Sequence, residues 1–148
     1  MTPNADGLDG LRPAERARLD RFAALFERLD ASQYATLTEL EDTPEVEAAQ
    51  EEAFRLVGRS GPRRDAVRGA IKAFTDAATV AYAQRMSLPD TLLLFQSLPD
   101  RATDRYRFLE SVERAVVALI LWDELGEEDR EVLVGPWSAL LLPIIDHT

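Results

Sequence analysis

Residues 115–122 read AVVALILW, and all eight side chains are apolar. Arg114 and Asp123 bound this stretch, which is less than half the length that a membrane span needs. In a water-soluble protein, a helix that is apolar on every side is enclosed by other helices. The sequence therefore predicts a central helix over about 103–125 within an all-α fold, a compact bundle of six to seven antiparallel or orthogonal helices.

Apolar residues at helical spacing extend this prediction to both sides of the central helix. Leu19, Phe22, Phe26 and Leu29 follow one another at intervals of three and four, which predicts a helix that begins at Pro13. Further helices are predicted over 32–41, 44–57, 62–86, 127–134 and 137–144. Gly58 is expected to end its helix by adopting the left-handed backbone conformation, and Pro143 is expected to interrupt the last helix. No stretch alternates with period two, so no sheet is expected.

The four-residue sequence SLPD occurs twice, at 87–90 and at 97–100. We interpret both copies as helix starts, with proline in the first turn and aspartate near the positive end of the helix dipole.

A chain of 148 residues suits one domain. We expect a flexible leader over 1–10, a single all-α domain over 11–148 and, because the N-terminus has no signal-peptide pattern, a cytoplasmic protein.

Composition removes several kinds of chemistry. The chain has no cysteine and a single histidine, His147, which is the penultimate residue. Thiolate metal sites, cysteine nucleophiles and imidazole metal sites within one chain are therefore excluded, and no cofactor is expected. The net charge of −10 opposes non-specific binding to nucleic acid and to anionic membranes. The expected partner is another protein or a second copy of this chain.

Charge is unevenly distributed along the sequence. Residues 39–52 hold seven acids and no base, which is the pattern of a solvated helix face or of a surface that docks a basic partner. Arg64, Arg68 and Lys72 have the spacing i, i+4, i+8, so they share one helix face as a basic stripe. This stripe is a candidate site for an anionic ligand or a partner's acidic segment, and Lys72 can instead pair with Asp76.

Two pairs of glutamates are a candidate metal site. Glu110 and Glu113 form an ExxE pair, and Glu128 and Glu131 form another. Two such pairs on neighbouring helices can hold Mg²⁺ between them. The pattern is similar to that of all-α nucleoside-triphosphate pyrophosphohydrolases, although the second pair of that family normally ends in aspartate. The resemblance covers these four positions only and implies a Mg²⁺-dependent hydrolase.

Asp123 breaks a local rule, because it lies on the apolar side of the central helix near the negative end of the helix dipole. We expect it to be buried and paired with an arginine, and the alternative is that it faces a ligand cavity.

The C-terminal apolar group is a further candidate, either closing the core or sealing a subunit interface. Its members are Trp137, Leu140, Leu141 and Ile144.

These features support three functional hypotheses. The first is a non-enzymatic interaction module, which is an adaptor, a regulator or a homo-oligomer. The second is a small-molecule sensor or carrier with a pocket between helices. The residues expected to line that pocket are Phe74, Tyr82, Phe95, Phe108 and Trp122. The third is the Mg²⁺-dependent hydrolase.

Overall fold

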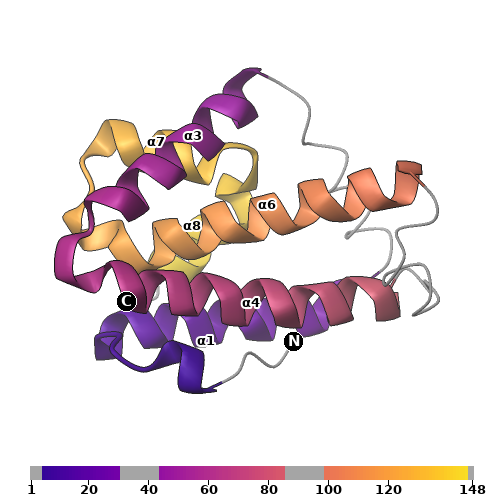
Figure 1. Cartoon of the computed structure of the whole chain (residues 1–148), viewed down its shortest axis with the longest axis horizontal. Helices are drawn as coiled ribbons and strands as arrows, with labels where there is room; N and C mark the ends of the chain where they lie inside the picture. Colours follow the sequence, from indigo (N-terminus) through magenta and orange to yellow (C-terminus); the bar gives the residue numbers. More distant parts are fainter. Residues whose placement is uncertain (1–4, 31–43, 86–98, 147–148) are drawn as a thin grey trace.

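The computed structural model describes residues 5–30, 44–85 and 99–146, and within these ranges it confirms an all-α bundle without strands (Figure 1). Six α-helices lie in this part of the chain: α1 (Pro13–Arg28), α3 (Pro44–Arg59), α4 (Arg64–Arg85), α6 (Pro99–Leu121), α7 (Glu127–Val134) and α8 (Ser138–Asp146). Short 3-10 turns connect or precede them: η1 (Ala5–Leu8), η2 (Gly61–Arg63), η3 (Trp122–Glu124) and η4 (Gly135–Trp137).

Helix α6 is the centre of the bundle, as the apolar stretch predicts. It contacts α1, α3, α4 and α7, and residues 115–121 are each at most 3% exposed. Trp122 is half-buried, because the helix gives way to the η3 turn after Leu121. At its other end α6 begins at Pro99, earlier than the predicted start near 103, so the proline of the second SLPD copy is its first residue.

An aromatic cluster joins α1, α4 and the C-terminal segment. Phe22 meets Phe26 edge-on with ring centroids 4.8 Å apart, and it stacks on Phe74 at 5.9 Å. Trp137 lies 6.4 Å from Phe22 and 6.2 Å from Phe26. Each such pair adds to the apolar burial that the rings provide. The α1 stripe predicted from spacing is therefore the side of α1 that faces the core.

The C-terminal apolar group closes this core. Trp137, Leu141 and Ile144 are buried within the chain itself, and Leu140 packs against them half-buried. Of the two alternatives for this group, the structure supports core closure, because the three buried residues offer no surface to a second copy. Pro143 lies inside α8 and does not interrupt it.

Residues 5–8 of the predicted flexible leader form the η1 turn. The η1 turn packs against α4, and Leu8 is buried. Gly7 allows this approach, because a Cβ at that position would lie only 2.9 Å from the carbonyl oxygen of Gly69. A polar N-terminal segment is therefore part of the folded structure.

The α3–α4 connection also differs from its prediction. Helix α3 continues through Gly58 to Arg59, and the left-handed conformation falls on Gly61, at φ 59°. Ser60 caps the helix end, since its hydroxyl donates to the carbonyl of Val57 at 2.6 Å.

The predicted helix over 32–41 and the first SLPD copy lie outside the described residues. None of the described helices is both long and apolar enough to cross a bilayer.

Candidate functional site

A groove of about 380 Å³ opens where α3, α4 and α6 meet. Phe54 and Val57 of α3 and Ile71 of α4 give it an apolar lining. Arg68 and Lys72 of α4 add two cations, and Glu113 of α6 adds one carboxylate. The groove therefore combines an apolar surface with positive charge, a combination suited to a group that is partly apolar and partly anionic.

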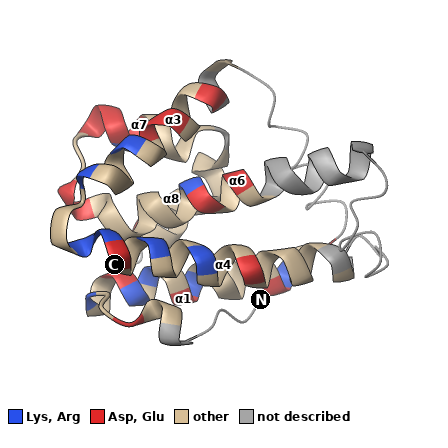
Figure 2. Ribbon diagram, viewed as in Figure 1, with Lys and Arg blue, Asp and Glu red and all other residues tan. Residues whose placement is uncertain are grey.

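The basic stripe lies on one face of α4, as its spacing predicts, and two of its members, Arg68 and Lys72, line the groove. Arg64, Arg68 and Lys72 are all exposed on α4 (Figure 2). Lys72 donates to Asp76 at 3.0 Å, which confirms the predicted i, i+4 pair. Within the described ranges, no carboxylate lies within ion-pair distance of Arg64 or Arg68. An exposed pair such as Lys72–Asp76 is weak, so Lys72 remains available to a partner.

Phe54 is the site residue that sequence reasoning missed. Its side chain is 60% exposed, although it lines the groove. Glu47, Glu51 and Phe54 have the spacing i, i+4, i+7, so they share one exposed face of α3. A lone aromatic residue in an otherwise acidic helix face was the signal in the sequence that could have identified it.

A buried polar contact fixes one wall of the groove. Arg114 of α6 donates to the Gln50 side-chain oxygen at 3.2 Å and to the Ser111 hydroxyl at 3.1 Å. All three side chains are buried between α3 and α6. Hydrogen bonds at such positions hold two helices in one register, because breaking them would leave buried polar groups unsatisfied. The position of Phe54, one turn further along α3 than Gln50, is thereby fixed relative to α6.

Glu113 is half-buried in the groove wall. Burial raises the pKa of its carboxyl, the neighbouring charge of Glu110 raises it further, and Arg114 opposes both. Arg68 and Lys72 line the same groove from α4. A carboxyl with these surroundings holds its proton at a higher pH than an exposed glutamate does.

The glutamine variant Glu113→Gln is expected to gain stability relative to the natural protein as pH rises. Because the folded pKa lies above the unfolded one, the folded state binds more protons between the two values, and wild-type stability falls as pH rises through this window. Glutamine has no proton to lose, so the difference in melting temperature should grow as pH rises from the unfolded-state pKa of glutamate through the raised folded-state pKa, and then level. Thermal unfolding at several pH values measures it, and a difference that is constant with pH would contradict the assignment.

The face of the molecule formed by α3 and α7 is acidic (Figure 2). Glu47 and Glu51 are exposed on α3, and Glu127, Glu128 and Glu131 are exposed on α7. Arg55 joins the two helices, since it binds Glu52 and lies 3.8 Å from Asp129. Its hydrogen bond lowers the pKa of Glu52, and contact with Glu52 raises the pKa of Asp129. The acidic surface therefore runs beside the groove, opposite the basic stripe of α4.

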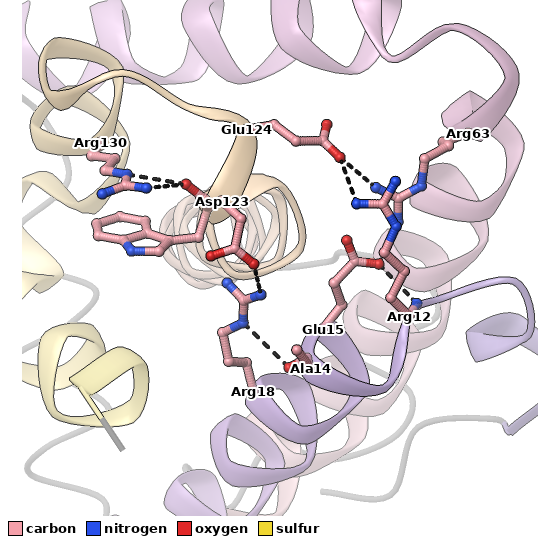
Figure 3. A network of polar contacts seen from close by, with 9 residues as sticks. Arg12, Ala14, Glu15, Arg18, Arg63, Asp123, Glu124 and Arg130 are labelled. Carbon is pink, nitrogen blue, oxygen red and sulfur yellow. Dashed lines mark hydrogen bonds and ion pairs between the residues drawn. The ribbon is translucent and has the colours of Figure 1, made fainter. Parts of the chain in front are cut away.

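Asp123 lies in a separate polar network at the end of α6 (Figure 3). As predicted, its partner is an arginine: the Arg18 guanidinium donates to the Asp123 carboxylate at 2.7 Å. The predicted burial is wrong, because the Asp123 side chain is 69% exposed whereas that of Arg18 is 2% exposed. The desolvated charge is therefore the Arg18 guanidinium, and Asp123 supplies its counter-charge from the surface.

The neighbouring Glu124 and Glu15 hold two more arginines (Figure 3). Glu124 accepts from Arg12 at 3.3 Å and from Arg63 at 2.8 Å. Glu15, which is buried, binds Arg63 and accepts from the backbone N–H of Arg12 at 2.9 Å. Arg130 stacks on the Trp122 ring at 4.6 Å and donates to the Trp122 carbonyl. These contacts tie α1, η2, η3 and α7 together, so we assign the network to stability.

The carboxylate pairs do not form the predicted metal site. In the described ranges, no group of three or more acidic or histidine side chains is placed to hold a metal ion. Glu110 and Glu113 lie half-buried on α6, whereas Glu128 and Glu131 are exposed on α7. The hypothesis of a Mg²⁺ ion shared by these four residues is therefore wrong for this structure, and the hydrolase loses its support.

The predicted pocket of aromatic residues falls only partly within the described residues. Phe74 and Tyr82 are buried in the core, and Trp122 lines a different depression beside Arg130. Phe95 and the side chain of Phe108 lie outside the described residues. The groove between α3, α4 and α6 is the cavity that two residues of the basic stripe, Arg68 and Lys72, line.

Comparison with known proteins adds no relative: no family model and no curated protein matches the sequence, and no solved structure matches the fold. Function must therefore be inferred from the side chains of the candidate site themselves.

Proposed function

We propose that the protein is a non-enzymatic interaction module that binds an acidic segment of a partner protein in the groove between α3, α4 and α6. The partner's acids pair with Arg64, Arg68 and Lys72. An apolar side chain of the partner enters the groove beside Phe54 and contacts Val57 and Ile71. Interfaces of this kind place an apolar anchor in a pocket and surround it with charged contacts.

One observation carries this proposal: an exposed aromatic residue, an apolar groove and an exposed basic stripe lie side by side in a protein of net charge −10. The segment 61–101 holds six bases and four acids, so it has a net charge of +2 and the rest of the chain −12. On α4 the bases Arg64, Arg68 and Lys72 gather on one exposed face, so an acidic partner is attracted to that face.

Charge reversal of the stripe tests the proposal. The probe is a fluorescently labelled amphipathic peptide of about 18 residues that carries glutamates and one phenylalanine. The triple variant Arg64→Glu, Arg68→Glu, Lys72→Glu is expected to bind it at least about tenfold more weakly. The far-UV circular dichroism spectrum should stay unchanged, because all three residues are exposed and their replacement leaves the helical core intact. Fluorescence anisotropy measures the affinity.

The matched control is Arg28→Glu, which reverses an exposed arginine on α1 away from the groove. It should bind the peptide as the natural protein does. A second peptide with lysines in place of the glutamates should not displace the first peptide from the groove. Peptide affinity that survives the triple reversal would exclude the basic stripe as an interaction surface.

A small amphiphilic acid is a second candidate ligand, and the volume of the groove favours it. About 380 Å³ falls within the range of cavities that bind small molecules. Such an acid would place its anionic group at Arg68 and Lys72 and its apolar part against Ile71. Decanoate that raises the melting temperature of the natural protein, but not of Lys72→Glu, would support this candidate over the peptide.

A further inference from the structure

The surface beside the groove has two rows of opposite charge. On α3, Glu47 and Glu51 are exposed, and Phe54 follows them on the same helix face. On α4, Arg68 and Lys72 are exposed and line the other side of the groove. In Figure 2, acidic positions on α3 and basic positions on α4 are both visible on the face turned to the reader. One copy of the chain therefore presents both an acidic row and a basic row, with an apolar groove between them.

Such a surface is complementary to itself. A two-fold rotation about an axis along the groove turns the second copy over, so that its α3 row faces the α4 row of the first. In such an arrangement Glu47 and Glu51 of each copy would lie on the side of Arg68 and Lys72 of the other, and both contacts would form at once. The same rotation brings each Phe54 over the groove of the opposite copy.

We infer that the partner of the groove is a second copy of this chain, bound as a two-fold dimer in which each Phe54 enters the other copy's groove. This inference rests on the proposed function, because it names the acidic, apolar-anchored partner that the groove binds. The occupant supplies an acidic row from Glu47 and Glu51 and an apolar anchor from Phe54. Dimerisation buries an aromatic side chain that is 60% exposed in the single chain.

The arrangement ends at two subunits. Both rows lie on the same face of the chain, so each row of one copy is paired with a row of the other. No row is then left to bind a third copy. A contact between different faces would leave one row free on each copy and would continue into a filament. The net charge of −10 on each copy opposes their approach at long range, and at physiological salt this repulsion is screened beyond about 8 Å.

Charge exchange between the rows tests the dimer. One variant makes both rows basic, with Glu47→Arg and Glu51→Arg, and the other makes both acidic, with Arg68→Glu and Lys72→Glu. Sedimentation equilibrium should find the natural protein as a dimer and each variant alone as a monomer, because like charges then face each other. An equimolar mixture should restore a dimer, since a basic row of one variant faces an acidic row of the other at both contacts.

Phe54→Ser should also yield a monomer, and Val80→Ser is its control. Val80 is exposed on α4 and does not line the groove, so this variant should dimerise as the natural protein does. A monomeric natural protein would overturn the dimer, whereas peptide binding to the groove would still uphold the proposed function. A dimer that persists in both charge variants, or a mixture that stays monomeric, would overturn this arrangement as well.

Discussion

The substitution Leu119→Ala is expected to lower the free energy of unfolding by about 2–5 kcal/mol. Leu119 is fully buried in α6, the helix that contacts α1, α3, α4 and α7. Removing its side chain loses apolar burial and leaves a cavity that surrounding helices fill only in part. Urea denaturation followed by circular dichroism measures the change, which should appear as a lower midpoint at unchanged slope.

A matched control separates burial from helix propensity. Val80→Ala removes an apolar side chain from α4 that is 56% exposed, so stability should change by less than about 0.5 kcal/mol. If Leu119→Ala cost no more than Val80→Ala, α6 would not be enclosed by its neighbours, and the structure of the bundle would be wrong.

The helices that bury a continuous stripe could be predicted from the sequence. Periodicity placed the start of α1 at Pro13 and its buried residues at Leu19, Phe22 and Phe26, as the structure has them. It also placed α7 at 127–134. In these segments the pattern of apolar residues alone decides which face is inside, so a local reading suffices.

Other features depend on residues far apart in the sequence. The N-terminal segment is polar, which predicted a loose leader, but it docks because Gly7 meets Gly69 on α4. Gly58 has the residue type of a helix stop, yet the helix continues to Arg59 and Gly61 takes the left-handed conformation. Local residue type cannot decide between such glycines, because tertiary contacts determine where the chain turns.

The candidate site could be predicted only in part. The spacing of Arg64, Arg68 and Lys72 placed the basic stripe on one exposed face of α4, and the structure agrees. The groove beside it joins three helices, so no single segment of sequence contains its pattern. Glu113 was selected for a metal site that does not form, and its place in the groove became evident only from the packing of α6 against α4.

Arg18 and Asp123 show why burial was assigned to the wrong partner. The helical repeat of the apolar stretch 115–122 puts Asp123 on a buried face, but α6 ends at Leu121 and the η3 turn carries Asp123 outwards. Arg18 occurs on α1 between Glu15 and Leu19, both of which are buried. The acid one helical turn before it, Glu15, binds Arg63 instead, so only the fold reveals the partner of Arg18, 105 residues away.

This geometry predicts that removing the exposed partner costs more than replacing the buried one. Asp123→Ala leaves the buried guanidinium without its counter-charge, and the free energy of unfolding should fall by about 2 kcal/mol. Arg18→Met keeps the buried volume, and it leaves a carboxylate that water can solvate, so the loss should stay below about 1.5 kcal/mol. In the double variant the loss of unfolding free energy should be smaller than the sum of the two single losses. With Arg18 replaced, there is no buried charge that Asp123→Ala could leave unpaired. Urea denaturation of the three variants decides the order; if Arg18→Met is the more damaging single change, packing of the arginine side chain rather than its charge holds α1 against the end of α6.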